Sequence, residues 1–296
     1  MSEEEKKMSK TILKCVVGSY AHGLATEKSD IDYRTVYVTP TSELLKLGVG
    51  PYKGTTWIEG ETEDNTAYEI GHFLHLSSKS NPSILEVFKA PIILEDGFVI
   101  KNEPCGGILD QCPFDQNEHA GYFTRFKDYN HMPPWYYLRQ LFPFIWSSKG
   151  VYEAFRGYSH NQHKKLFDER DEFSKRKGKY AVAHLRVLLS GIELLSTNNF
   201  DVKVPHYYNK IHLHLPLWCI DWLESKGRHG EPSESWRNFL FDLKGLEPEQ
   251  VPIGVVIDTS EYLKSKLKQA YDANPNKQTD LEKVNEFLLE IRRKFW

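Results

Sequence analysis

The amino-acid sequence predicts an α+β fold, in which a mixed β-sheet with helices is followed by a mainly helical C-terminal part. Roughly the first 95 residues alternate β-prone runs with helical stretches, and from about Glu118 onward apolar residues recur mostly at helical spacing. Between these parts, the stretch Leu94 to Gln116 contains several glycines and prolines and only scattered apolar residues. We therefore expect two domains, residues 1–115 and residues 116–296.

The first element is a short strand that ends at a glycine. The run Thr11 to Val17 is β-prone, and Gly18 and Ser19 follow it. Glycine lets the backbone approach an anion closely, and the serine hydroxyl can donate a hydrogen bond to a phosphate oxygen. Ser19 to Ala25 can form a short helix whose N-terminus also favours a phosphate. This strand and turn therefore predict a phosphate-binding site.

The next strand carries a pair of carboxylates. The run Asp30 to Val38 is rich in β-branched and aromatic residues and follows a polar turn. Residues i and i+2 of a strand point to the same side, so Asp30 and Asp32 are expected to project together, about 7 Å apart. Mg²⁺ prefers carboxylate and phosphate oxygens. A lone pair of aspartates is most often a surface feature, but its place directly after a Gly-Ser turn favours nucleotide and metal binding.

An acidic segment and two helices are expected to follow. Residues 61–70 carry several acids and lead into a stretch with helical spacing of apolar residues. Within this segment Glu69 can also be the acid of a helix N-terminus, where the helix dipole favours a negative charge. Asn81-Pro82 predicts the start of a further helix, because proline suits the first turn. A short strand is expected at Phe98 to Ile100.

A basic stretch and an apolar helix mark the second half. The stretch His163 to Lys179 is rich in lysine and arginine and is interpreted as a solvated helix face with a loop, or as a local basic groove. Tyr180 to Leu189 predicts an apolar helix, and Lys179 and Arg186, seven residues apart, share one of its faces. His184, on the same helix, is interpreted as a structural residue.

The last predicted helix begins after a polar cap. Thr279 or Asp280 can cap it. An apolar stripe follows at helical spacing, made of Leu281, Val284, Phe287, Leu288 and Ile291. We expect this stripe to be part of the core rather than a partner-binding face.

Composition limits the class of protein. The hydrophobic fraction of 40% and the charged fraction of 27% are typical of a soluble globular protein. The formal net charge of −3 argues against a basic nucleic-acid binder as a whole, which leaves only a local basic groove. Since no apolar run approaches a membrane span and the charged N-terminus is unlike a signal peptide, we expect no membrane partner and a cytoplasmic location.

Residues 18–38, GSYAHGLATEKSDIDYRTVYV, resemble the DNA polymerase β-type nucleotidyltransferase superfamily. The signature of this superfamily is a Gly-Ser turn followed by a strand with paired carboxylates. The fuller pattern is similar to the predicted nucleotidyltransferases associated with RNA-repair gene neighbourhoods. The resemblance implies a nucleotidyltransferase palm, built on a mixed sheet with helices, and a mainly helical domain after it.

The resemblance also implies a third acidic residue on a later strand, which helps to bind the catalytic metal and accepts the proton of the attacking hydroxyl. By position Asp64 is the first candidate and Glu69 the second. The implied metal ligands are thus Asp30, Asp32 and Asp64. The metal is expected to be Mg²⁺, as two ions, with Mn²⁺ as an alternative.

The same resemblance assigns the triphosphate contacts. Gly18, Ser19 and Ser29 are implied to hold the nucleoside triphosphate, and Lys179 and Arg186 are implied to meet its β- and γ-phosphates. In this family a histidine often lies between that lysine and arginine. Here Ala183 takes its place and His184 comes one position later, which is a departure from the family pattern.

The implied activity is transfer of a nucleoside monophosphate from an NTP to an acceptor hydroxyl, with release of pyrophosphate. An RNA end is the favoured acceptor. Three alternatives stay open: nucleotidylation of a protein, nucleotidylation of a small molecule, and a non-catalytic module that binds nucleotide or RNA.

Overall fold

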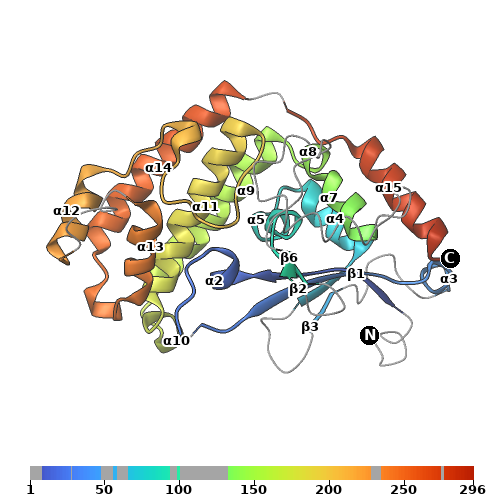
Figure 1. The fold of residues 1–296 in the computed structure, drawn as a ribbon, viewed down its shortest axis with the longest axis horizontal. Helices are drawn as coiled ribbons and strands as arrows, with labels where there is room; N and C mark the ends of the chain where they lie inside the picture. The colour runs from blue at the N-terminus through green and yellow to red at the C-terminus, as the bar shows by residue number, and fades with distance from the viewer. Residues whose placement is uncertain are drawn as a thin grey trace, which may run out of the picture.

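A computed structural model gives the fold of the chain (Figure 1). The structure describes residues 9–27, 29–47, 56–58, 66–93, 99–100, 133–227, 235–274 and 277–296. The predicted boundary between residues 115 and 116 lies outside these ranges, as does the candidate ligand Asp64.

The sheet is mixed, as expected. Its six strands lie in the order β3-β4-β2-β1-β5-β6. Their bounds are β1 Lys10–Val17, β2 Asp32–Val38, β3 Thr56–Ile58, β4 Thr66–Glu69, β5 Ile92–Ile93 and β6 Val99–Ile100. Strands β2 and β4 pair in parallel, and the other neighbours pair antiparallel. The parallel pairing places the start of β4 beside the start of β2. The start of β2 in turn pairs with the end of β1, where the Gly-Ser turn follows.

In the described part of the chain after residue 132, the regular elements are helices. The short helices of the first part are α2 Gly18–Ala21, α3 Thr41–Leu44, α4 Ile70–Ser78, α5 Pro82–Leu85 and the 3₁₀ turn η1 Glu86–Phe88. The later helices are α7 Pro134–Gln140, α8 Phe142–Ile145, α9 Ser148–Leu166, α10 Asp171–Ser174, α11 Lys177–Thr197, α12 Leu217–Ser225, α13 Trp236–Gly245, α14 Ile253–Ala273 and α15 Leu281–Lys294. The short 3₁₀ turns η4 Asn209–Ile211 and η5 Pro248–Gln250 lie between them. The α+β class with a mainly helical second part is therefore confirmed.

Two predicted boundaries were wrong near the turn. The helix expected over Ser19 to Ala25 ends at Ala21, because Gly23 adopts a left-handed conformation with φ +68° that ends it. The strand expected from Asp30 begins at Asp32. Strand β1 ends at Val17, which pairs with Asp32, so the residues before Asp32 have no β1 residue to pair with. Asp30 and Asp32 are therefore not alternate residues of one strand.

Several local predictions were confirmed. Strand β1 begins one residue before the predicted start. Asn81 caps α5 and Pro82 stands at its first position, as expected. Asp280 caps α15, since its side chain accepts a hydrogen bond from the Lys283 amide at 3.1 Å. Of the predicted stripe on α15, Val284, Phe287 and Ile291 are buried, whereas Leu281 is exposed.

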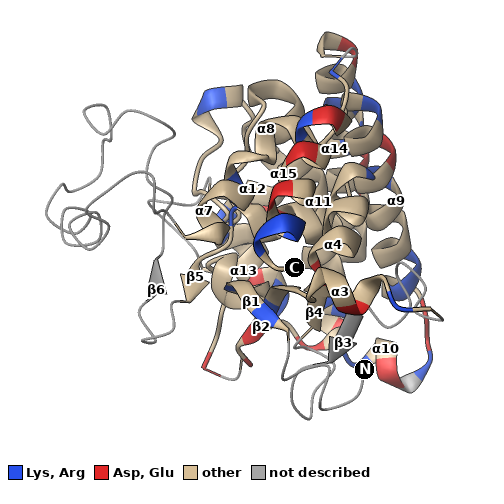
Figure 2. Cartoon of the chain, turned by 90° about the vertical axis from the view of Figure 1, so that its right-hand side faces the viewer, with Lys and Arg blue, Asp and Glu red and all other residues tan. Residues whose placement is uncertain are grey.

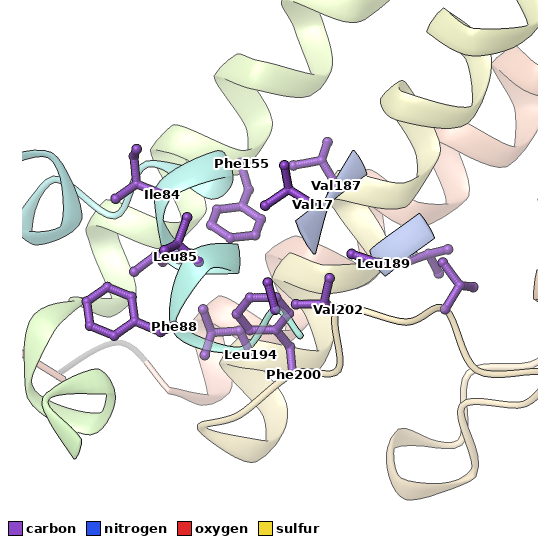
Figure 3. Packing of buried hydrophobic residues seen from close by; sticks show 14 of the residues in the cluster. Val17, Ile84, Leu85, Phe88, Phe155, Val187, Leu189, Leu194, Phe200 and Val202 are labelled. Carbon is purple, nitrogen blue, oxygen red and sulfur yellow. The ribbon is translucent and has the colours of Figure 1, made fainter. Parts of the chain in front are cut away.

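One hydrophobic core joins the sheet and the helices. Figure 3 shows Val17 of β1, Phe88 of η1, Phe155 of α9 and Val187 of α11 facing the same interior. In Figure 1, α4, α5, α7 and α8 cover one face of the sheet, and α9, α11, α13 and α14 continue beside them. The turn after β1 therefore lies where the sheet meets α11 and α13.

The C-terminal helix α15 returns to the sheet. It packs against α4 and α8, and the Thr41 amide of α3 donates to the Phe295 carbonyl at 2.8 Å. Figure 2 shows the basic last turn of α15, drawn blue, next to α3 and α4. That turn brings Arg292 to 2.6 Å from Glu69, at the end of β4. Helix α15 thus supports the same sheet to which β1 belongs.

Candidate active site

The Gly-Ser turn fits tightly against a carboxylate. Gly18 has a φ of +64°, a left-handed conformation that favours glycine. A Cβ placed on Gly18 would lie 2.0 Å from Asp32 Oδ2. Any side chain at residue 18 would therefore displace Asp32. The predicted phosphate-binding glycine and the predicted metal ligand form one unit.

We expect Gly18→Ala to remove activity and to destabilise the protein, because the methyl group meets Asp32 and the backbone is strained at positive φ. The cost is about 1–3 kcal/mol in the free energy of unfolding, measured by urea denaturation. Gly157→Ala is the matched control, since an added Cβ there meets nothing within 4 Å inside helix α9. The control should stabilise the protein by about 0.5–1 kcal/mol. Equal effects of the two changes would contradict the assigned fit.

The two aspartates lie at the entrance to β2. Asp30 is exposed and Asp32 is partly buried. The loop before them is ordered by Ser29, whose hydroxyl accepts from the Thr26 amide at 2.9 Å and whose amide donates to the Thr26 carbonyl at 2.9 Å. Both carboxylates offer the hard oxygen ligands that Mg²⁺ prefers. Since Gly18 leaves room for Asp32 Oδ2, the residues present fit a divalent cation bound together with phosphates.

Among the described residues, no group of three or more His, Cys, Asp and Glu side chains is placed to hold a metal ion. The first candidate for a third carboxylate, Asp64, lies outside the described residues. The second candidate, Glu69, is 1% exposed at the end of β4. Its Oε2 accepts from the Gly71 amide at 2.7 Å, which caps α4, and its Oε1 is 2.6 Å from Arg292. Both of its oxygens are therefore engaged within the fold, and a metal contact by Glu69 would require them to be released.

A lysine that follows Ser19 by 225 residues contacts the turn. Lys244 of α13 donates from Nζ to Ser19 Oγ at 2.7 Å and to the Leu24 carbonyl at 2.7 Å, and it lies 3.2 Å from Ser29 Oγ. Burial lowers the pKa of Lys244, and the neighbouring positive charge of Lys179 adds to this effect, while Asp32 opposes it. The structure thus gathers Ser19, Ser29 and a cation beside Asp32.

Lys179 lies in the same region. It is exposed on the first turn of α11 and close enough to influence the pKa of Lys244. The glycine before it permits this approach, because a Cβ at Gly178 would lie 2.6 Å from the Leu243 carbonyl of α13. Lys179 and Lys244 are therefore two cations that a triphosphate on the Gly-Ser turn could meet.

Arg186 is buried and paired with a carboxylate. It is 6% exposed and pairs through Nη1 with Glu86 Oε1 of η1. Glu86 Oε2 is also 3.2 Å from the Nε2 of His22, the residue that follows α2. Contact between Arg186 and a phosphate would require the pair with Glu86 to open. Lys179 therefore lies near Lys244, whereas the guanidinium of Arg186 is paired with Glu86.

His184 is buried, as expected of a structural residue. It is 0% exposed, and its Nδ1 is 2.7 Å from Ser159 Oγ of α9. Burial lowers the pKa of His184 to about 4. His184, the histidine that stands one position later than in the family pattern, thus contacts α9 rather than the Gly-Ser turn.

The sequence analysis did not identify Lys244, His22 or Glu86. Lys244 is separated from Ser19 by 225 residues, and Glu86 from His22 by 64. No local spacing connects such residues, because Lys244 meets Ser19 only when α13 packs beside α2, and Glu86 meets His22 only when η1 packs beside the end of α2. The available signals were the place of His22 inside the resembling segment and of Glu86 four residues after Pro82.

Among the residues that the structure describes, none of the helices combines the length and the apolar character needed to cross a bilayer.

Comparison with known proteins bears out the resemblance for the first part of the chain. Residues 1–102 match the family described as the RNA repair pathway DNA polymerase beta family. The chain is also 26% identical, over 121 residues, to an uncharacterized 38.9 kDa protein of the nrdC-mobD intergenic region of Enterobacteria phage T4. That match covers 39% of this chain and 34% of the phage protein, so the chain spans about a third of the length of this curated relative. No solved structure matches the chain.

Proposed function

We propose that the protein is a Mg²⁺-dependent nucleotidyltransferase that moves a nucleoside monophosphate from an NTP to an acceptor hydroxyl. The observation that carries the proposal is the fit of left-handed Gly18 against Asp32 Oδ2, with Lys244 bonded to the adjacent Ser19. A turn suited to phosphate, a carboxylate and a half-buried cation therefore meet at one point. The match of residues 1–102 to a polymerase β family supports the same activity.

In this proposal the acceptor oxygen forms a bond to the α-phosphorus of the NTP. The bond from that phosphorus to the oxygen bridging the β-phosphate breaks, and pyrophosphate leaves with the electron pair. Ser19 and Ser29 donate to the triphosphate, and Lys179 and Lys244 balance its charge. These residues accelerate the reaction by orienting the phosphates and by stabilising the negative charge that develops on the leaving group.

Asp30 and Asp32 would hold Mg²⁺, or Mn²⁺ in its place. A bound divalent cation supplies Lewis-acid stabilisation of the charge on the phosphate oxygens. We retain Asp64 as the third carboxylate. In the parallel register Thr66 pairs with Arg34, and Asp64 precedes Thr66 by the same two residues by which Asp32 precedes Arg34. Asp64 would take the proton from the acceptor hydroxyl.

We propose an RNA end as the acceptor. Support comes from the match to an RNA repair pathway family and from the exposed basic residues around Lys179. Transfer to a protein or to a small molecule is the alternative, as is a module that binds nucleotide or RNA without catalysis. The last alternative predicts nucleotide binding with no release of pyrophosphate.

The direct test is incubation with Mg²⁺ and each of four α-labelled NTPs, together with single-stranded RNA, a protein mixture or small hydroxyl compounds. Transfer of label to RNA with equimolar pyrophosphate would support the proposal. Label on protein or on a small molecule would keep the reaction and change the acceptor. Tight nucleotide binding without pyrophosphate under every condition would contradict an enzyme and favour the binding module.

Lys244→Met should raise the KM for the NTP by about 10–100-fold, because it removes a charge-assisted contact worth about 1.5–3 kcal/mol. Methionine keeps most of the side-chain length. The measurement is steady-state pyrophosphate release at varied NTP concentration. Lys226→Met is the control, since Lys226 is exposed after α12. An unchanged KM for Lys244→Met would remove Lys244 from the proposed phosphate contacts.

A further inference from the structure

Three polar side chains from distant parts of the chain form a buried group behind the Gly-Ser turn. Glu86 of η1 accepts from Arg186 of α11 and from His22 of the turn. The side chains of Arg186 and Glu86 are only 8% and 9% exposed, and that of His22 is 12% exposed. The proposed binding of phosphate by the Ser19 and Ser29 hydroxyls does not involve Glu86, Arg186 or His22.

Charged groups at such depth are held together strongly. Burial alone would raise the pKa of Glu86, but the Arg186 guanidinium and the His22 side chain together outweigh burial and lower the pKa to about 2. Burial lowers the pKa of His22, and the positive charge of Arg186 adds to this effect. Glu86 therefore stays ionised between the permanent cation of Arg186 and the neutral ring of His22. Loss of Glu86 or of Arg186 alone would leave the other charge unpaired in the interior.

His22 connects this group to the turn by its backbone as well. The His22 amide donates to the Gly18 carbonyl at 3.0 Å, and the His22 carbonyl accepts from the Val204 amide at 3.0 Å. The side chain of His22 is the remaining link, and it ends on Glu86. A movement of Glu86 would therefore be passed through His22 to Gly18, the residue that fits against Asp32.

We propose that Arg186 and Glu86 are positioning residues that act through His22 to hold the Gly-Ser turn in the geometry that binds the triphosphate. Arg186 thereby serves the nucleotide site without touching the nucleotide. The inference deepens the proposed function and rests on it for the effect on nucleotide binding. The effect on the turn itself is independent of any nucleotide.

The test uses the double variant Glu86→Leu/Arg186→Met in the full-length protein. Replacing both members of a buried ion pair by apolar residues of similar size is often neutral for stability, so this variant is expected to fold. Leucine at residue 86 nevertheless cannot accept a hydrogen bond from His22, so that contact is lost. Single substitutions would leave an unpaired buried charge and are less informative. Ser159→Ala is the control, because it removes a buried contact with His184 away from the turn.

Two measurements are made on each protein. The first is amide hydrogen exchange of the peptide that covers residues 18–24, without nucleotide. In the double variant this exchange should be about tenfold faster than in the wild type, as expected when a buried hydrogen bond is lost. The second is the KM and kcat for the NTP. The KM should rise about tenfold or more, with a smaller change in kcat, because the triphosphate site is displaced. Ser159→Ala should leave both unchanged.

Two outcomes would overturn the inference. Unchanged exchange of residues 18–24 in a folded double variant would show that the group does not hold the turn. A raised KM with unchanged exchange would indicate that Arg186 contacts the phosphates directly. If the wild-type protein binds no nucleotide, the proposed function fails, and the exchange measurement alone still decides whether Arg186 and Glu86 position the turn.

Discussion

Asp32→Asn should reduce nucleotidyl transfer by about a hundredfold to a thousandfold or more, without unfolding the protein. Asparagine has the shape of aspartate, so it still fits beside Gly18, but it lacks the negative charge that would hold the cation. Because the proposed cation and phosphates would share this point, both binding and charge stabilisation should be lost. The measurement is release of pyrophosphate at saturating Mg²⁺, with thermal unfolding followed in parallel.

Asp272→Asn is the control for Asp32→Asn. Asp272 pairs with Lys268 on the exposed face of α14, far along the chain from the turn, and its loss should leave transfer unchanged. Asp30→Asn should also impair transfer, since Asp30 is the second proposed ligand. Transfer at the wild-type rate by Asp32→Asn protein would show that the proposed metal assignment is wrong.

Arg292→Met should lower the free energy of unfolding by about 3–5 kcal/mol, because it leaves the carboxylate of Glu69 buried without its cation. The side chain of Glu69 is only 2% exposed, and Arg292 Nη1 lies 2.6 Å from its Oε1. Arg292 also donates to the Thr39 carbonyl at 3.2 Å. The loss is measured by urea denaturation.

Arg293→Met is the neighbouring control. Arg293 is exposed in the same helical turn, so its replacement should change stability by less than about 0.5 kcal/mol. The double variant Glu69→Gln/Arg292→Met should regain much of the loss, since glutamine keeps the cap of α4 and carries no charge. Similar losses from Arg292→Met and Arg293→Met would contradict a special role of the Glu69 pair.

The elements that were predicted well have local causes. The strand before Gly18, the cap at Asn81 and the cap at Asp280 each depend on residues within a few positions of one another. The pair Gly18 and Asp32 is also close in sequence, and its contact follows from a single strand–turn–strand unit. The start of β2 was missed because it depends on where β1 stops pairing rather than on β-propensity.

The candidate site divides in the same way. Ser19 and the two aspartates were predicted because the turn and its flanking strands gather them locally, and Ser29 was predicted from the resemblance. For Glu69, the interpretation as a helix N-terminal acid agrees with its cap of α4, but its pair with Arg292 could not be foreseen. Lys179 and Arg186 were predicted as a pair from their helical spacing. Tertiary packing separates them, since Lys179 is exposed beside Lys244 and Arg186 is buried against Glu86.

By itself, then, the sequence determined the chemistry of the turn: a glycine, a hydroxyl and two carboxylates within 15 residues, from Gly18 to Asp32. Only the tertiary structure decided which distant groups complete and support that turn. Lys244 of α13 contacts Ser19 directly, and Glu86 of η1, paired with Arg186 of α11, contacts His22. The physical reason is that backbone propensity acts over a few residues, whereas the pairing of buried charges depends on their distance in space and not on their separation in the sequence.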